Sequence, residues 1–108
     1  MEKFKFNKST DRLFEAILAL KTVKEAEAFF RDLCTIDELK ELSERWAIVR
    51  LLNKNWPYRK IAEKLKVSTT TVSRVALWLH NGMGGYGLIL NRLNRHHHNS
   101  PPIGKELR

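Results

Sequence analysis

The stretch from Thr35 to Asn53 holds more apolar residues than one face of an amphipathic helix carries. It opens with Thr35 and Glu38 at the spacing of a capping box, which predicts that a helix starts there. The apolar positions that follow are Leu39, Leu42, Trp46, Ile48, Val49, Leu51 and Leu52. A stripe this wide exceeds what one neighbouring helix covers. The sequence therefore predicts a central helix that is buried on several sides or shared between two subunits.

Shorter stretches of helical periodicity lie on both sides of this central helix. One apolar face consists of Leu13, Phe14, Ile17 and Leu18, and Thr22 with Glu25 repeats the capping-box spacing. No strand pattern and no internal repeat are present, so we predict an all-α fold of about six helices. Beyond the central helix, we expect helices over about 57–65 and 69–80, a glycine-rich joint over 81–87, and a last amphipathic helix through Leu93.

The length of 108 residues suits one domain with a modest core, which dimerisation would help to stabilise. We predict a flexible arm over 1–9, a folded domain over 10–95 and a disordered basic tail over 96–108. No apolar run approaches the roughly 18 residues of a membrane span, and no secretory signal is visible. The expected location is the cytoplasm, without a membrane partner.

Several kinds of active site are excluded by residue content. The single cysteine, Cys34, forms no intrachain disulfide and no cysteine-ligated zinc site. The consecutive His96–His98 tract could bind a soft metal adventitiously, but we expect a solvated polar tail, and no metal site is predicted. The basic half holds only Glu63 and Glu106 as acids, and its glycines do not follow a strand as in a phosphate-binding loop. We therefore predict neither an enzyme nor a cofactor.

Charge is distributed unevenly along the chain. Residues 1–44 carry 8 Lys and Arg against 10 Asp and Glu, whereas residues 45–108 carry 12 against 2. The second half thus has a net charge of +10 in a chain whose net charge is +8. Such an asymmetry favours a polyanionic partner for the second half, and nucleic acid is the commonest soluble polyanion.

The segment Tyr58–Arg74, YRKIAEKLKVSTTTVSR, has the pattern of a helix-turn-helix. Ile61, Ala62 and Leu65 share one face of a first helix, Val67 fills the turn, and Ser68 can cap the second helix. The pattern resembles helix-turn-helix regulators in general. Lys66 stands where such motifs usually carry Gly, so it must adopt a left-handed conformation or the turn must differ.

The outward side chains of this segment suit contacts with double-stranded DNA. Short hydroxyl side chains reach base edges, and threonine methyl groups contact thymine. Cations around them neutralise phosphates. The predicted base-contacting residues are Ser68, Thr69, Thr70, Thr71 and Ser73. The predicted phosphate-contacting residues are Lys54, Arg59, Lys60, Lys66 and Arg74.

A wider resemblance covers roughly Leu13 to Leu93. The runs LFEAILALK and FFRDLCTIDELKELSERWAIVRLLNKN, followed by YRKI and STTTVSR, are similar to the Trp repressor superfamily, above all to TrpR-like proteins of the YerC/YecD type. This resemblance implies a compact homodimer in which the N-terminal and last helices of the two subunits interlock. Each subunit would present one recognition helix to successive major grooves, so the resemblance also implies a palindromic operator.

The resemblance also implies an effector pocket. In the tryptophan-responsive repressor the indole lies between two arginines, with a threonine nearby, and the matching positions are Arg45, Arg74 and Thr35. Two further positions depart from that repressor: this chain has Val75 where the repressor has a glycine, and Trp78 where the repressor has a serine. Overpacking of this kind opposes a ligand by about 1–3 kcal/mol.

Trp78 is therefore expected to fill, or partly fill, the space of a free tryptophan, and DNA binding should not require this co-repressor. Other roles stay open for three of the pocket residues. Arg45 has the spacing for an ion pair with Glu41, Thr35 for a helix cap, and Arg74 for a DNA phosphate.

Together these observations predict a DNA-binding transcriptional regulator, a repressor in its simplest form, whose effector is unidentified. The main alternative is a helical protein–protein interaction module in which the basic charge is incidental. A detached DNA-binding part of a recombinase and an RNA-binding domain are further alternatives. The sequence does not support the recombinase, because catalytic carboxylates are missing. It also offers no exposed aromatic platform that would support RNA binding.

Overall fold

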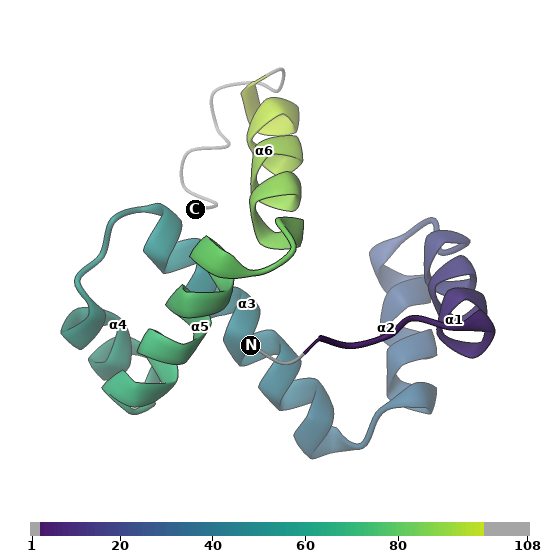
Figure 1. The fold of residues 1–108 in the computed structure, drawn as a ribbon, viewed down its shortest axis with the longest axis horizontal. Coiled ribbons are helices and arrows are strands. Elements are labelled where there is room, and N and C mark those ends of the chain that lie inside the picture. Colours follow the sequence, from purple (N-terminus) through teal and green to yellow (C-terminus); the bar gives the residue numbers. More distant parts are fainter. Residues whose placement is uncertain (1–2, 99–108) are drawn as a thin grey trace. The chain divides into compact units, whose positions relative to one another are not determined.

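The computed structural model describes residues 3–98, and within this range it contains six α-helices (Figure 1). This result confirms the predicted all-α class. None of the described helices is long and apolar enough to cross a membrane. The helices are α1 (Lys8–Leu18), α2 (Val23–Leu33), α3 (Ile36–Asn53), α4 (Tyr58–Leu65), α5 (Thr69–Asn81) and α6 (Gly85–His98).

The starts of α2 and α3 follow the predicted caps. The Thr35 hydroxyl accepts a hydrogen bond from the backbone N–H of Glu38 at 3.1 Å, and the Glu38 carboxylate accepts one from the N–H of Thr35 at 2.8 Å. At α2 the Thr22 hydroxyl accepts from the N–H of Glu25 at 3.1 Å, while the Glu25 carboxylate binds the N–H of Lys21 instead of Thr22. Local hydrogen bonding therefore starts both helices where the sequence predicts.

Two predicted boundaries are wrong. The arm was expected to extend to residue 9, but α1 begins at Lys8, because Asn7 caps it by accepting the N–H of Thr10 at 3.0 Å. The tail was expected from residue 96, but α6 continues to His98. The rest of the predicted tail, residues 99–108, and the side chains of His96–His98 lie outside what the structure describes.

The described residues divide into two compact units, 3–40 and 41–98, where the sequence analysis predicted one domain over 10–95. In the first unit, α1 and α2 bury none of their residues. Before α1, the ring centroids of Phe4 and Phe6 are 5.1 Å apart, and Phe6 also contacts Phe14 of α1, with a centroid distance of 6.1 Å. Two helices with one apolar stripe each are too few to enclose a core.

The second unit has a core shared by α3, α4 and α5. Its buried residues are Ile48, Val49, Ile61, Ala62, Val72 and Val75. Trp46 of α3 and Tyr86 of α6 pack against this core, with their ring centroids 6.2 Å apart. The core thus fixes the packing of α4 against α5.

In the wide apolar stripe of α3, two residues near the C-terminal end are buried and the others are exposed or only partly buried. Ile48 and Val49 are fully buried, whereas Leu42 is 42% exposed. The predicted burial of this helix on several sides is therefore incomplete within one chain. Sharing of the stripe between two subunits stays a prediction.

Candidate nucleic-acid interface

The predicted helix-turn-helix is formed by α4, a short turn and α5 (Figure 1). Val67 lies in the turn and packs against the core, as predicted. Lys66 adopts the left-handed conformation, with φ 59° and ψ 46°, so the first of the two possibilities raised by its sequence position is confirmed. Small Ala62, which is 8% exposed, allows α4 and α5 to approach each other closely.

The five predicted base-contacting residues all lie at the start of α5, but two of them are engaged in the helix cap. The Ser68 hydroxyl accepts from the backbone N–H of Thr71 at 3.0 Å, and the Ser68 and Thr71 hydroxyl oxygens are also 3.0 Å apart. Thr69, Thr70 and Ser73 are exposed. The structure therefore separates a capping pair from three hydroxyl side chains that face solvent.

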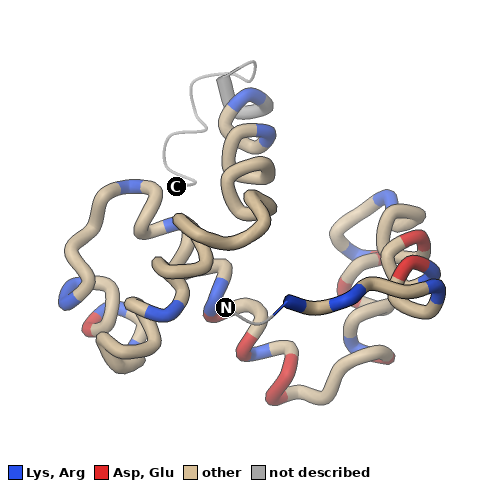
Figure 2. The backbone as a smooth tube through the Cα atoms, viewed as in Figure 1, with Lys and Arg blue, Asp and Glu red and all other residues tan. Residues whose placement is uncertain are grey.

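Four of the five predicted phosphate-contacting cations are exposed around this segment. They are Arg59 and Lys60 on α4, Lys66 in the turn and Arg74 on α5. Lys54 differs, because it is partly buried and interacts within the chain. Figure 2 shows Lys and Arg around α4 and α5. In the sequence of these two helices, Glu63 is the single acidic residue.

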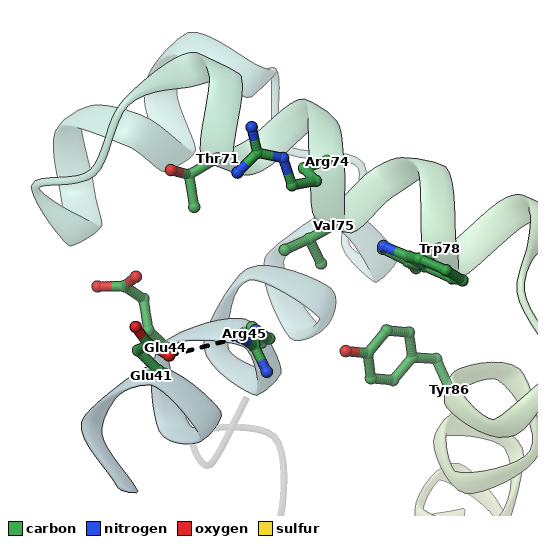
Figure 3. A pocket seen from close by; sticks show the side chains of 8 residues that line it. All are labelled: Glu41, Glu44, Arg45, Thr71, Arg74, Val75, Trp78 and Tyr86. Atoms are coloured by element: carbon green, nitrogen blue, oxygen red, sulfur yellow. Dashed lines mark ion pairs between the residues drawn. The ribbon is translucent and has the colours of Figure 1, made fainter. Parts of the chain in front are cut away.

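A cavity of about 450 Å³ lies between α3 and α5 in the second unit (Figure 3). It brings together four of the five residues predicted for the effector pocket, namely Arg45, Arg74, Val75 and Trp78. The complete lining consists of Glu41, Glu44, Arg45, Thr71, Arg74, Val75, Trp78 and Tyr86. Thr35 is not part of this lining; it caps α3 from the first unit, which is the alternative role considered for it.

Two acidic residues, Glu41 and Glu44, line the cavity, although neither was predicted as a pocket residue. Arg45 Nη2 lies 3.5 Å from Glu41 Oε1, which confirms the alternative ion pair for Arg45. Both side chains are more than half exposed, so this pair contributes little to stability. Glu44 is a third charged group on the same wall. The spacing of Glu41, Glu44 and Arg45 on one helical face could have revealed this wall in advance.

Trp78 lines the cavity instead of filling it, and its side chain is 44% exposed. It also lines a second, apolar hollow of about 560 Å³, together with Trp46, Gly82, Met83, Gly85, Tyr86 and Ile89. Trp78 and Tyr86 therefore belong to both hollows. No cluster of three metal-ligating side chains is present in the part of the chain that the structure describes.

Comparisons of the sequence and of the structure with known proteins point to the same family. The family model of the Trp repressor protein matches residues 8–94. The uncharacterized protein YerC of Bacillus subtilis (strain 168) is 41% identical over 86 residues, which are 80% of this chain and 83% of YerC.

Two crystal structures have similar folds, each with a TM-score of 0.78. A TrpR-like protein from Eubacterium eligens ATCC 27750 is 42% identical, over 82% of this chain and 91% of that one. A protein from Staphylococcus aureus, proposed to be a Trp repressor, is 37% identical, over 82% of this chain and 89% of that one.

Proposed function

Because this chain belongs to the Trp repressor family, we propose that it is a sequence-specific DNA-binding regulator of transcription, a repressor that binds a palindromic operator as a homodimer. The observation that carries this proposal is the exposed, hydroxyl-rich start of α5, which α4 braces and cations surround. The proposal includes no enzymatic activity, metal or cofactor, and places the protein in the cytoplasm with the DNA.

Base recognition is assigned to the three solvent-facing residues of α5, Thr69, Thr70 and Ser73. Each offers a hydroxyl group to base edges in the major groove, and the two threonines add methyl groups that contact thymine. Ser68 and Thr71 were predicted in the same role. Their mutual hydrogen bonding instead supports a positioning role, since the cap orients the first turn of α5.

The homodimer is supported by apolar surface that one chain leaves uncovered. On α1 and α2, Phe14, Leu18, Val23 and Leu33 are between 45% and 83% exposed. The apolar hollow beside Trp78 provides further uncovered surface in the second unit. Burial of such surfaces drives association. A two-fold dimer presents two copies of α5, and its symmetry requires a palindromic site.

Selection of random duplexes with the purified protein, at one fixed salt concentration, tests the proposed function. We expect an enriched palindrome whose half-sites are separated by about one helical turn of DNA. Weak association that salt abolishes, with no enriched sequence, would instead support the protein–protein interaction module.

Substitutions at Thr70 and Lys60 should separate base recognition from phosphate binding. Thr70→Ala removes a hydroxyl and a methyl group from the tip of α5, so we expect a changed base preference at one position of each half-site, by about 1–3 kcal/mol.

Lys60→Ala should weaken binding to all sequences alike and flatten the salt dependence. Titration of matched and mismatched duplexes over a salt series measures both effects. An unaltered salt slope for Lys60→Ala would show that Lys60 does not contact the DNA backbone.

We further propose that DNA binding does not require free L-tryptophan. Val75, which is 5% exposed, and the Trp78 indole occupy the wall of the cavity, and Arg45 is paired with Glu41. Isothermal calorimetry with L-tryptophan should show no micromolar binding, and the duplex selection should be unchanged when L-tryptophan is added. Clear micromolar heats would refute this part of the proposal. They would leave the proposed DNA binding intact.

A further inference from the structure

Lys66 occupies a backbone position that favours glycine. It caps the C-terminus of α4 with φ 59° and ψ 46°, in the left-handed region. Among the described residues, Asn55 and Lys66 are the non-glycine residues with positive φ. Asparagine tolerates this region because its short polar side chain can bond locally, but lysine has no such compensation and is strained there.

The surrounding turn imposes this conformation on Lys66. Its backbone N–H donates to the Ala62 carbonyl, and the N–H of Val67 donates to the same oxygen at 3.1 Å. Immediately after the turn, Ser68 caps α5. The backbone is thus held on both sides of Lys66, and glycine would adopt the same conformation with less strain.

The Lys66 side chain does not offset this strain within the folded chain. It is exposed, and within residues 3–98 its ammonium has neither a hydrogen bond nor an ion pair. It lies between Leu65, the last residue of α4, and the exposed start of α5. The position therefore carries a free positive charge beside the tip that is proposed to enter the major groove.

We propose that Lys66 is a positioning residue that anchors the turn to a DNA phosphate and thereby sets the placement of α5 in the groove. This inference rests on the proposed DNA-binding function. In helix-turn-helix proteins the first helix crosses the DNA backbone while the second enters the groove. A lysine between the two helices therefore meets the phosphates at the edge of the groove. On this proposal, Lys66 lowers the stability of the folded protein without DNA, but it stabilises the complex with DNA.

Four variants separate backbone strain from charge. Lys66→Gly removes both, Lys66→Gln removes only the charge, and Lys66→Arg keeps both. The matched control is Lys64→Gln, which removes an exposed lysine two positions earlier, within α4. Each variant is examined by thermal unfolding and by titration with the selected duplex over a salt series.

Lys66→Gly should unfold about 3–5 °C higher than the wild type, whereas Lys66→Gln should show no such rise. Both should bind the duplex about tenfold more weakly and lower the slope of log K against log salt by about 2, for one lost phosphate contact in each subunit. Lys66→Arg should bind like the wild type, and Lys64→Gln should lose less affinity than either uncharged Lys66 variant.

Two results would overturn the inference. Wild-type affinity and salt slope in Lys66→Gly would show that Lys66 contacts no phosphate. An unchanged or lowered unfolding temperature of the same variant would show that the lysine is not strained. Binding of no duplex by the wild type would instead refute the proposed function itself, so the two failures are distinguishable.

Discussion

If the protein is the proposed homodimer, the double substitution Phe14→Asp and Leu18→Asp is expected to convert it into monomers and to lower affinity for the proposed operator at least about a hundredfold. Phe14 is 45% exposed and Leu18 is 83% exposed in the single chain, and they lie four residues apart on one face of α1. Carboxylates at these positions would have to be desolvated without partners in a dimer interface. A monomer then contacts one half-site only and loses the gain from bivalent binding.

Sedimentation equilibrium gives the oligomeric state, and duplex titration gives the affinity. Arg12→Asp is the matched control, because it places a carboxylate at an exposed polar position of the same helix and should leave the dimer intact. Circular dichroism should show unchanged helix content in both variants. A double variant that is still dimeric would show that this face of α1 is not in the interface.

The second large effect is expected for Ile61→Ala. Ile61 is completely buried in the core of the second unit, where α4 packs against α5. Removing its side-chain carbons leaves a cavity, which lowers the free energy of unfolding by about 2–4 kcal/mol. Since α4 braces α5, the proposed recognition helix, affinity for the proposed operator should fall as the unfolded fraction rises.

Equilibrium denaturation in urea, followed by circular dichroism, measures this loss. Glu63→Ala is the control, because Glu63 is exposed on the same helix and its removal should change stability by less than about 0.5 kcal/mol. Equal stability of the Ile61→Ala variant and the wild type would contradict the packing of α4 described above.

The helix-turn-helix was largely predictable because its signals are local. Ser68 caps α5 through the backbone N–H of Thr71, three residues further on, and the left-handed conformation of Lys66 was one of the two possibilities that its sequence position raised. The start of α1 was missed because the reciprocal bonding of Asn7 and Thr10 was not recognised as a capping signal. Both cases depend on residues within a few positions of each other.

The cavity was predictable only in part. The resemblance selected Arg45, Arg74, Val75 and Trp78, and the structure brings these four together. Glu41, Glu44 and Tyr86 were not selected, because no local signal says which helix faces meet. Thr35 was selected, but it is absent from the lining and serves as a helix cap.

The amino-acid sequence alone determined the helical class, the helix caps at Thr22, Thr35 and Ser68, and the positive charge of the second half, since these depend on nearby residues and composition. Only the tertiary structure decided which hydroxyl groups face solvent and that Trp78 lines two hollows. It also decided that α1 and α2 bury none of their residues. These properties depend on how distant helices pack, and packing is set by the fit of whole faces rather than by any short pattern.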